Sequence, residues 1–171
     1  MKRVLLLTIM SCCFITSVLG QNRYVISKDG VGPVKMGSAY TKAKPAMSVM
    51  CKMIWENYHD MIDLMQVTCF DNETDRNMMV QFNTGEAPDD KLLRTFYVYS
   101  PVFKTDKGLS TASTSRDILN AGGKFTRGEI HIYLQLDGLY FFFNEDDLSG
   151  RSLKSEAKPF QISNVPHCVE Y

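Results

Sequence analysis

The chain has 171 residues, of which 44% are hydrophobic, 11% aromatic and 22% charged, and its 19 Lys and Arg balance 19 Asp and Glu. These values are typical of a folded globular protein and exclude an intrinsically disordered chain, which needs low hydrophobicity and a high net charge. A formal net charge of zero gives no reason to expect nucleic-acid binding, which requires a basic surface. Outside the N-terminus no apolar run reaches 18 residues, so we expect no transmembrane span in the mature chain.

Residues 1–20 have the layout of a secretory signal peptide. The basic residues Lys2 and Arg3 precede an apolar stretch, and Gly20 stands at its end, directly before Gln21. Removal of this segment leaves 151 residues with 17 Lys and Arg against 19 Asp and Glu, a formal charge of −2. We expect an exported protein, periplasmic or extracellular.

A second processing route competes with this one. The segment Ile9-Met10-Ser11-Cys12 weakly resembles a bacterial lipobox, and cleavage before Cys12 would leave an outer-membrane lipoprotein. Met10 fits such a motif poorly, and the apolar stretch continues past it.

Three cysteines remain after the signal peptide, and an exported chain permits disulfides. Cys51 and Cys69 lie in the same half of the chain and form the predicted pair, which leaves Cys168 as an odd thiol. Three unpaired cysteines stay an open alternative, because a sequence does not supply the geometry of a disulfide.

The first half of the chain predicts one helix followed by strands. Pro45 is suited to the first turn of a helix, so we expect a short helix near 46–54, then a loop and a strand from about residue 62. Residues 67–70 are expected to pair with a strand at 78–82.

Residues 91–100 predict a further strand, with Phe96 and Val98 on one face and Tyr97 and Tyr99 on the other. A second helix is predicted after it. Ser113 is suited to cap this helix, and Gly122-Gly123 would end it.

The strongest local signal is a β-hairpin over residues 129–143. Apolar residues alternate with other side chains up to Asp137-Gly138, a dipeptide that favours a two-residue turn and thereby fixes the register. The predicted cross-strand pairs are Leu136 with Leu139, Gln135 with Tyr140, Leu134 with Phe141, Tyr133 with Phe142 and Ile132 with Phe143.

A weak internal repeat links the two halves. Alignment of Val34 with Leu109 also matches Ser38 with Ser113, although Ala112 then stands opposite a glycine. Two unrelated helix starts would explain so short a match equally well.

Two of these segments carry a resemblance to known proteins. Residues 34–38 resemble the apolar-x-x-Gly-Met/Ser-Thr/Ser motif of beta-lactamase-inhibitor-like proteins and of small BamE-type lipoproteins. The segment 99–109, followed by Ser113, is similar to exported proteins of Bacteroides-type bacteria, and the resemblance covers most of residues 25–145. It implies helices on one face of an antiparallel sheet, often as a tandem pair, and either protein partners or no known role.

We therefore expect an α+β fold, a mainly antiparallel sheet with short helices on one face. The mature chain 21–171 would form a single domain, with a tandem pair of helix-plus-sheet units at 21–90 and 91–150 and a C-terminal tail at 151–171 as one arrangement.

The sequence contains no pattern of residues that predicts catalysis, a cofactor or a metal. The three histidines are scattered, no GxSxG motif is present, and CxxC is absent. The acidic clusters at 71–75, 89–90 and 145–147 lack the spacing of a calcium loop and are interpreted as solvated turns.

The second face of the predicted sheet is unusually aromatic. A solvated sheet face normally carries Thr, Lys and Glu, whereas amphipathic rings are typical of interfaces. Burial of this face under the tail 152–171 is the alternative. The predicted ligand-binding residues are Tyr97, Tyr99, His131, Tyr133, Tyr140 and Phe142.

Three function classes follow. The first is a non-enzymatic binding module of the bacterial cell envelope that engages a protein or a glycan through the aromatic face. The second is a secreted hydrolase with His131 in a cleft, and the third is a structural envelope protein without a separable ligand.

The signal peptide generates the first prediction. The protein purified from its native host should begin at Gln21, because residues 1–20 carry the export signal. Intact-mass spectrometry measures this directly, and a mass that includes diacylglyceryl-modified Cys12 would contradict it and support the lipoprotein.

Overall fold

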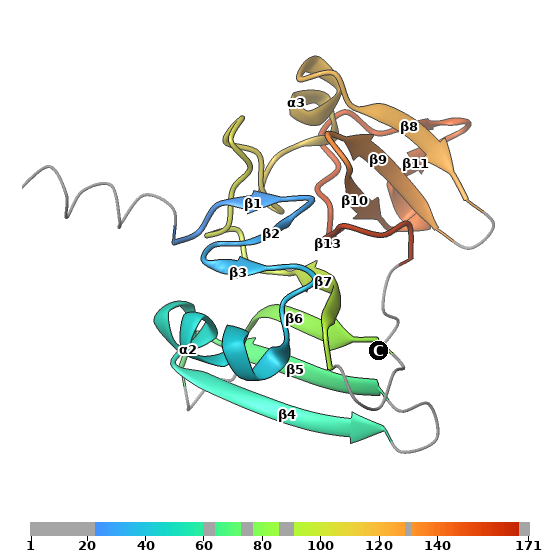
Figure 1. Ribbon diagram of the computed structural model, residues 1–171. Coiled ribbons are helices and arrows are strands. Elements are labelled where there is room, and N and C mark those ends of the chain that lie inside the picture. Colours follow the sequence, from blue (N-terminus) through green and yellow to red (C-terminus); the bar gives the residue numbers. More distant parts are fainter. Residues whose placement is uncertain (1–22, 60–63, 73–76, 86–90, 129–130, 168–171) are drawn as a thin grey trace, which may run out of the picture.

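An antiparallel sheet forms the framework of the protein in this computed structural model, which describes residues 23–59, 64–72, 77–85, 91–128 and 131–167 (Figure 1). The strands of this main sheet are β4 (Met53–His59), β5 (Leu64–Phe70), β6 (Met78–Thr84), β7 (Leu93–Val98), β8 (Lys124–Arg127), β9 (Ile132–Leu136), β10 (Leu139–Phe143) and β13 (Gln161–Ser163). They are ordered β4-β5-β6-β7-β13-β10-β9-β8, and each neighbouring pair is antiparallel.

Short elements complete the fold. They are the small sheet β1 (Ile26–Ser27), β2 (Gly30–Val31) and β3 (Val34–Lys35), the hairpin β11 (Leu148–Ser149) and β12 (Ser152–Leu153), the helices α2 (Tyr40–Met50) and α3 (Ser115–Asn120), and the 3-10 turn η2 (Glu145–Asp147). The α+β class with a mainly antiparallel sheet is therefore confirmed.

The main sheet consists of two successive groups of four strands. In chain order α2 precedes β4 to β7, and α3 precedes β8, β9, β10 and β13. Figure 1 shows α2 beside one group and α3 beside the other. Because β7 pairs with β6, the boundary between the groups falls after β7 and not at residue 90 as expected from the sequence.

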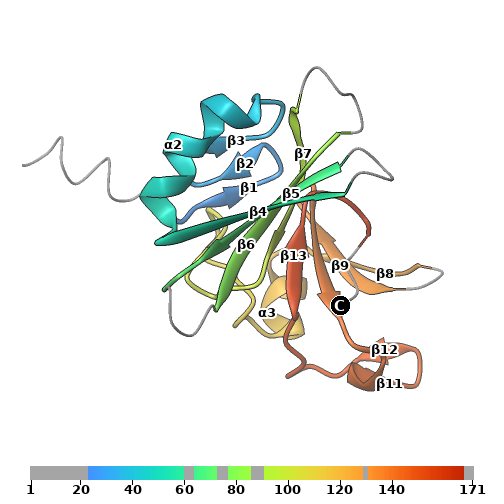
Figure 2. The same ribbon diagram turned by 90° about the horizontal axis from the view of Figure 1, so that it is seen from below.

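Strand β13 joins the two groups and corrects the expectation of a C-terminal tail. It lies between β7 and β10 and pairs with both, with Ile162 opposite Val98 on one side and Phe141 on the other. Figure 2 shows β13 between the strands of the first group and those of the second. Residues 161–163 of the expected tail are therefore a central strand of the sheet.

The predicted hairpin is confirmed in every described pair. Leu134 lies opposite Phe141 and Tyr133 opposite Phe142, and the three other pairs also match. Asp137 and Gly138 both have a positive φ, of 52° and 78°, as the predicted two-residue turn requires.

Helix α2 begins earlier than the sequence suggested. It covers Tyr40–Met50 instead of 46–54, and Pro45 lies inside it. The missing N–H of Pro45 leaves the carbonyl of Thr41 without its helical donor, but both residues are exposed, so water can replace that hydrogen bond. The buried side chains Tyr40, Ala43, Met47 and Met50 follow helical spacing and hold the helix on the sheet.

The residues after α2 form a strand where a loop was expected. Strand β4 pairs with β5 along its whole length, from Met53 opposite Phe70 to His59 opposite Leu64. As an edge strand it is partly solvated on both faces, so its sequence lacks the clean alternation that identified the hairpin.

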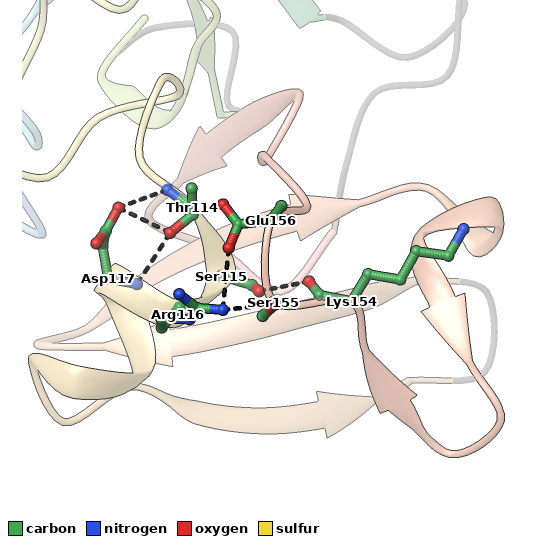
Figure 3. A network of polar contacts seen from close by, with 7 residues as sticks. All are labelled: Thr114, Ser115, Arg116, Asp117, Lys154, Ser155 and Glu156. Carbon is green, nitrogen blue, oxygen red and sulfur yellow. Dashed lines mark hydrogen bonds and ion pairs between the residues drawn. The ribbon is translucent and has the colours of Figure 1, made fainter.

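Helix α3 is capped by Thr114 and not by Ser113. The Thr114 side chain accepts a hydrogen bond from the Asp117 N–H, and the Asp117 carboxylate accepts one from the Thr114 N–H at 2.9 Å. Figure 3 shows how this helix is tied to the segment before β13. Ser115 Oγ donates to the Lys154 carbonyl at 2.7 Å, and Arg116 contacts Ser155 and Glu156, each at 3.0 Å.

One face of the sheet carries the hydrophobic core. Side chains of α2, of β1 to β3 and of α3 pack there with the inward-facing residues of the strands, among them Phe82, Phe96, Leu134 and Phe141. A disulfide between Cys51 and Cys69 joins the end of α2 to β5, as the sequence predicted. No helix of the described residues lies on the opposite face of the sheet, which is called the open face below.

The central position of β13 generates the second prediction. Ile162→Ala should lower the free energy of unfolding by about 2–5 kcal/mol, because it removes a fully buried side chain from the strand that joins the two groups. Val102→Ala is the control, since Val102 is 41% exposed and its truncation should change stability little. The free energy of unfolding of both variants is measured by urea denaturation. If Ile162→Ala lowers it as little as Val102→Ala does, residues 161–163 do not occupy the sheet.

Candidate binding face

The open face presents one continuous row of side chains across all the strands of the main sheet. The pairing registers place in this row Trp55, Thr68, Gln81, Tyr97, Ser163, Tyr140, Gln135 and Lys124. A neighbouring row in the second group contains Gln161, Phe142, Tyr133 and Thr126. A neighbouring row in the first group contains Asn57, Gln66, Asn83 and Thr95.

The predicted site residues differ in how far they are exposed to solvent. Tyr97 is 6% exposed and Phe142 is fully buried, so neither ring offers free area to a partner. The other four, which are Tyr99, His131, Tyr133 and Tyr140, are half-buried. Of the predicted ligand-binding residues, four are therefore partly accessible and two are buried.

Three of the predicted residues gather around a fourth, Phe142. The rings of Tyr133 and Tyr140 meet edge to face at 5.3 Å between centroids, and those of His131 and Tyr133 lie 5.9 and 5.7 Å from Phe142. Phe160 adds a ring 6.5 Å from Phe142 and is 37% exposed. We call this group the ring cluster; it consists of His131, Tyr133, Tyr140, Phe142 and Phe160.

Gln161 connects the ring cluster to Tyr99. It lies opposite Phe142, and its Nε2 donates to the Tyr99 hydroxyl at 3.1 Å. Its Oε1 is buried without a hydrogen-bond partner among the described residues. If the amide group is rotated by 180°, Oε1 accepts from the Tyr99 hydroxyl and Nε2 becomes the buried atom without a partner. In either orientation one end of the Gln161 amide therefore lacks a hydrogen bond among the described residues.

An exposed aromatic side chain lies on the outer edge strand of the first group. Trp55, the single tryptophan of the chain, lies on edge strand β4 and is 57% exposed. Thr68, Gln81, Tyr97 and Ser163 lie between it and the ring cluster along the row, and all of them are buried. The exposed rings therefore form two separate patches.

The described residues in these rows carry almost no charge. Lys124, at the outer strand, is the only one with a formal charge, and amides, hydroxyls and rings make up the rest. A Gln135 Nε2 to Tyr140 hydroxyl bond of 3.4 Å is typical of the polar contacts there.

Charged groups cluster instead on the side of α2. Lys44 and the Tyr40 hydroxyl both bond to Glu56 Oε1, at 2.6 and 2.5 Å. The Lys44 hydrogen bond, with that of Tyr40, holds the pKa of Glu56 below its usual value, while burial and the Glu56 carboxylate raise the pKa of Tyr40. This cluster attaches α2 to β4.

Two residues outside the sequence prediction, Phe160 and Gln161, lie beside Phe142, and a third, Trp55, lies in the separate patch on β4. Trp55 was missed because β4 was interpreted as helix and loop, and Phe160 and Gln161 were missed because the tail was expected to lie outside the sheet. The short alternation Phe160-Gln161-Ile162-Ser163 after Pro159 was the signal that could have identified them.

Within the described ranges no group of His, Cys, Asp and Glu residues is suited to hold a metal ion. Two small cavities of about 310 and 250 Å³ lie near β1, away from the ring cluster. In the same part of the chain no helix is long and apolar enough to cross a membrane.

The chain matches no protein-family model and no curated protein sequence. Among solved structures it is similar to that of the uncharacterised protein YfeY from Escherichia coli, with a TM-score of 0.57 and 13% sequence identity. The match covers 81% of this chain and 97% of YfeY. At this identity the likeness concerns the fold alone.

Proposed function

We propose that this protein is a non-enzymatic binding module exported to the bacterial cell envelope, and that it binds its partner through the open face. The observation that carries the proposal is the ring cluster, in which half-buried Tyr133 and Tyr140 lie above the fully buried Phe142. The sheet fixes the position of these rings, so binding would cost little further ordering.

The export part of the proposal rests on the signal-peptide pattern of residues 1–20 and on the resemblance to exported proteins of Bacteroides-type bacteria. The Cys51–Cys69 disulfide is compatible with an oxidising compartment. The alternative localisation is the outer membrane, to which the protein would be attached as a lipoprotein through Cys12.

A hydrolase would need His131 beside a nucleophile and an orienting acid. The ring of His131 instead packs against Phe142 as part of the ring cluster, an arrangement that supports binding rather than proton transfer. A purely structural role remains the other alternative, and the experiment below distinguishes it from binding.

The ring cluster generates the third prediction. Tyr133→Ala with Tyr140→Ala should weaken binding to a solubilised envelope extract of the source organism by about 2–4 kcal/mol, because both rings are central anchors. Surface plasmon resonance against the extract, divided into a protein fraction and a protease-treated carbohydrate fraction, measures the loss.

Two controls separate a loss of binding from a loss of fold. Phe142→Ala removes a buried ring and should cost about 3–5 kcal/mol of stability, clearly more than either tyrosine variant in the same thermal unfolding assay. Trp55→Ala removes an exposed ring from the other edge and should bind like the wild type. If neither fraction binds, or if the double variant binds both fractions unchanged, the proposed function is wrong.

A further inference from the structure

The two edge strands of the main sheet, β8 and β4, differ in how well they are protected against pairing with another chain (Figure 1). An edge strand presents main-chain N–H and C=O groups to any further strand, and proteins block such edges with short strands, Pro and charged side chains. Strand β8 is blocked in this way, since it has four residues and carries Lys124 and Arg127 at its ends. Strand β4 has seven residues without Pro or Gly, and Glu56 is its only formally charged residue.

We propose that β4 is a dimerisation edge, at which it pairs antiparallel with β4 of a second copy of this chain. The two-fold axis passes beside Trp55, so the main sheets of both copies join into one. This proposal goes beyond the proposed function, because it concerns a different part of the molecule and a different partner.

The main-chain groups of Ile54 and Glu56 point away from β5, as such a pairing requires. Successive residues of a strand direct these groups alternately to its two sides. Met65 of β5 donates its N–H to Thr84 Oγ1 of β6, at 3.1 Å, so Met65 is not hydrogen-bonded to Tyr58, the residue opposite it on β4. By alternation the main chains of Tyr58, Glu56 and Ile54 are directed outward. Among the described residues only β5 pairs with β4, so an added strand would meet these groups directly.

An antiparallel pair centred on Trp55 matches the side chains of β4 to one another. Ile54 then exchanges main-chain hydrogen bonds with the partner's Glu56. Trp55 lies opposite the partner's Trp55 in a non-hydrogen-bonded pair, where side chains come closest and aromatic pairs stabilise the sheet. Trp55 is 57% exposed, the highest value for a large hydrophobic side chain among the described residues. The pairing would cover this ring.

Charge favours this register over the neighbouring one. A pair centred on Glu56 would place two carboxylates directly opposite each other, which is destabilising. In the pair centred on Trp55 each Glu56 lies opposite an isoleucine and keeps its ion pair of 2.6 Å with Lys44 of its own α2. The strand therefore complements itself, and this is why we assign a second copy to the edge. A single pair of strands is a small interface, so the dimer should dissociate on dilution.

The proposed dimer leaves the ring cluster accessible. The two-fold axis of an antiparallel pair runs perpendicular to the sheet, so the open faces of both copies lie on the same side. The buried residues Thr68, Gln81, Tyr97 and Ser163 separate Trp55 from the ring cluster. A single ring cluster should therefore bind its partner with the same affinity in the monomer and in the dimer.

The β4 edge generates the fourth prediction, which sedimentation velocity measures across a dilution series. The wild type should change from monomer to dimer as its concentration rises. Trp55→Lys and Trp55→Glu should each be monomeric at the concentrations where the wild type is a dimer, because each places like charges opposite each other across the two-fold axis. An equimolar mixture of the two variants should dimerise again, since Lys then faces Glu.

The mixture makes the test independent of folding, because a misfolded variant would not regain pairing. Phe125→Ala is the matched control: it removes a ring that is 38% exposed from the other edge strand and should dimerise like the wild type. A wild type that stays monomeric at every concentration, or a Trp55→Lys variant that dimerises as well as the wild type, would overturn the proposal.

Cross-linking tests the register. In a Cys168→Ser background, Trp55→Cys should form a disulfide-linked dimer when an oxidant is added, because opposite Cβ atoms of a non-hydrogen-bonded pair come close enough for a disulfide. Asn57→Cys should not, since Asn57 would lie opposite the partner's Met53. Cross-linking of Asn57→Cys without cross-linking of Trp55→Cys would contradict the pairing centred on Trp55.

Discussion

The pairing of β13 with both β7 and β10 is the interaction on which the rest of the structure depends. This strand has three residues, yet it joins two groups of four strands into one sheet, with Ile162 fully buried at the junction. Its position is held from outside the sheet by α3, which bonds to residues 154–157 just before the strand. The same strand contributes Gln161 to the open face, so the junction and the candidate site are inseparable.

The two faces of the sheet differ in chemistry. The core face packs under α2, α3 and the small sheet, and its charged groups, such as Lys44 and Glu56, form ion pairs at the margin. The open face carries amides, hydroxyls and rings, and Lys124 is the one formally charged residue in its described rows.

The parts of the fold that local signals determine were predictable from the sequence. The hairpin of β9 and β10 was predicted to the residue, because alternation and the Asp137-Gly138 turn specify one register. Helix α2 was misplaced because Pro45 is tolerated inside it on an exposed side, and tertiary packing of Met47 and Met50 outweighs the local signal. Strand β13 escaped prediction since three residues carry little pattern and both of its partners are distant in sequence. Of the candidate site, the tyrosines were therefore found and Gln161 and Phe160 were not.

The central claim is that Tyr133 and Tyr140 are accessible residues of a binding face, whereas Tyr97 and Phe142 on the same face are buried. Hydroxyl-radical footprinting with mass spectrometry tests it in one experiment, because the oxidation rate of a ring follows its exposure to solvent. In the free protein Tyr133 and Tyr140 should be oxidised faster than Tyr97 and Phe142, and the envelope extract should protect them while Trp55 stays unprotected. Unchanged oxidation of Tyr133 and Tyr140 in the presence of that extract, or protection of Trp55 alone, would contradict the account.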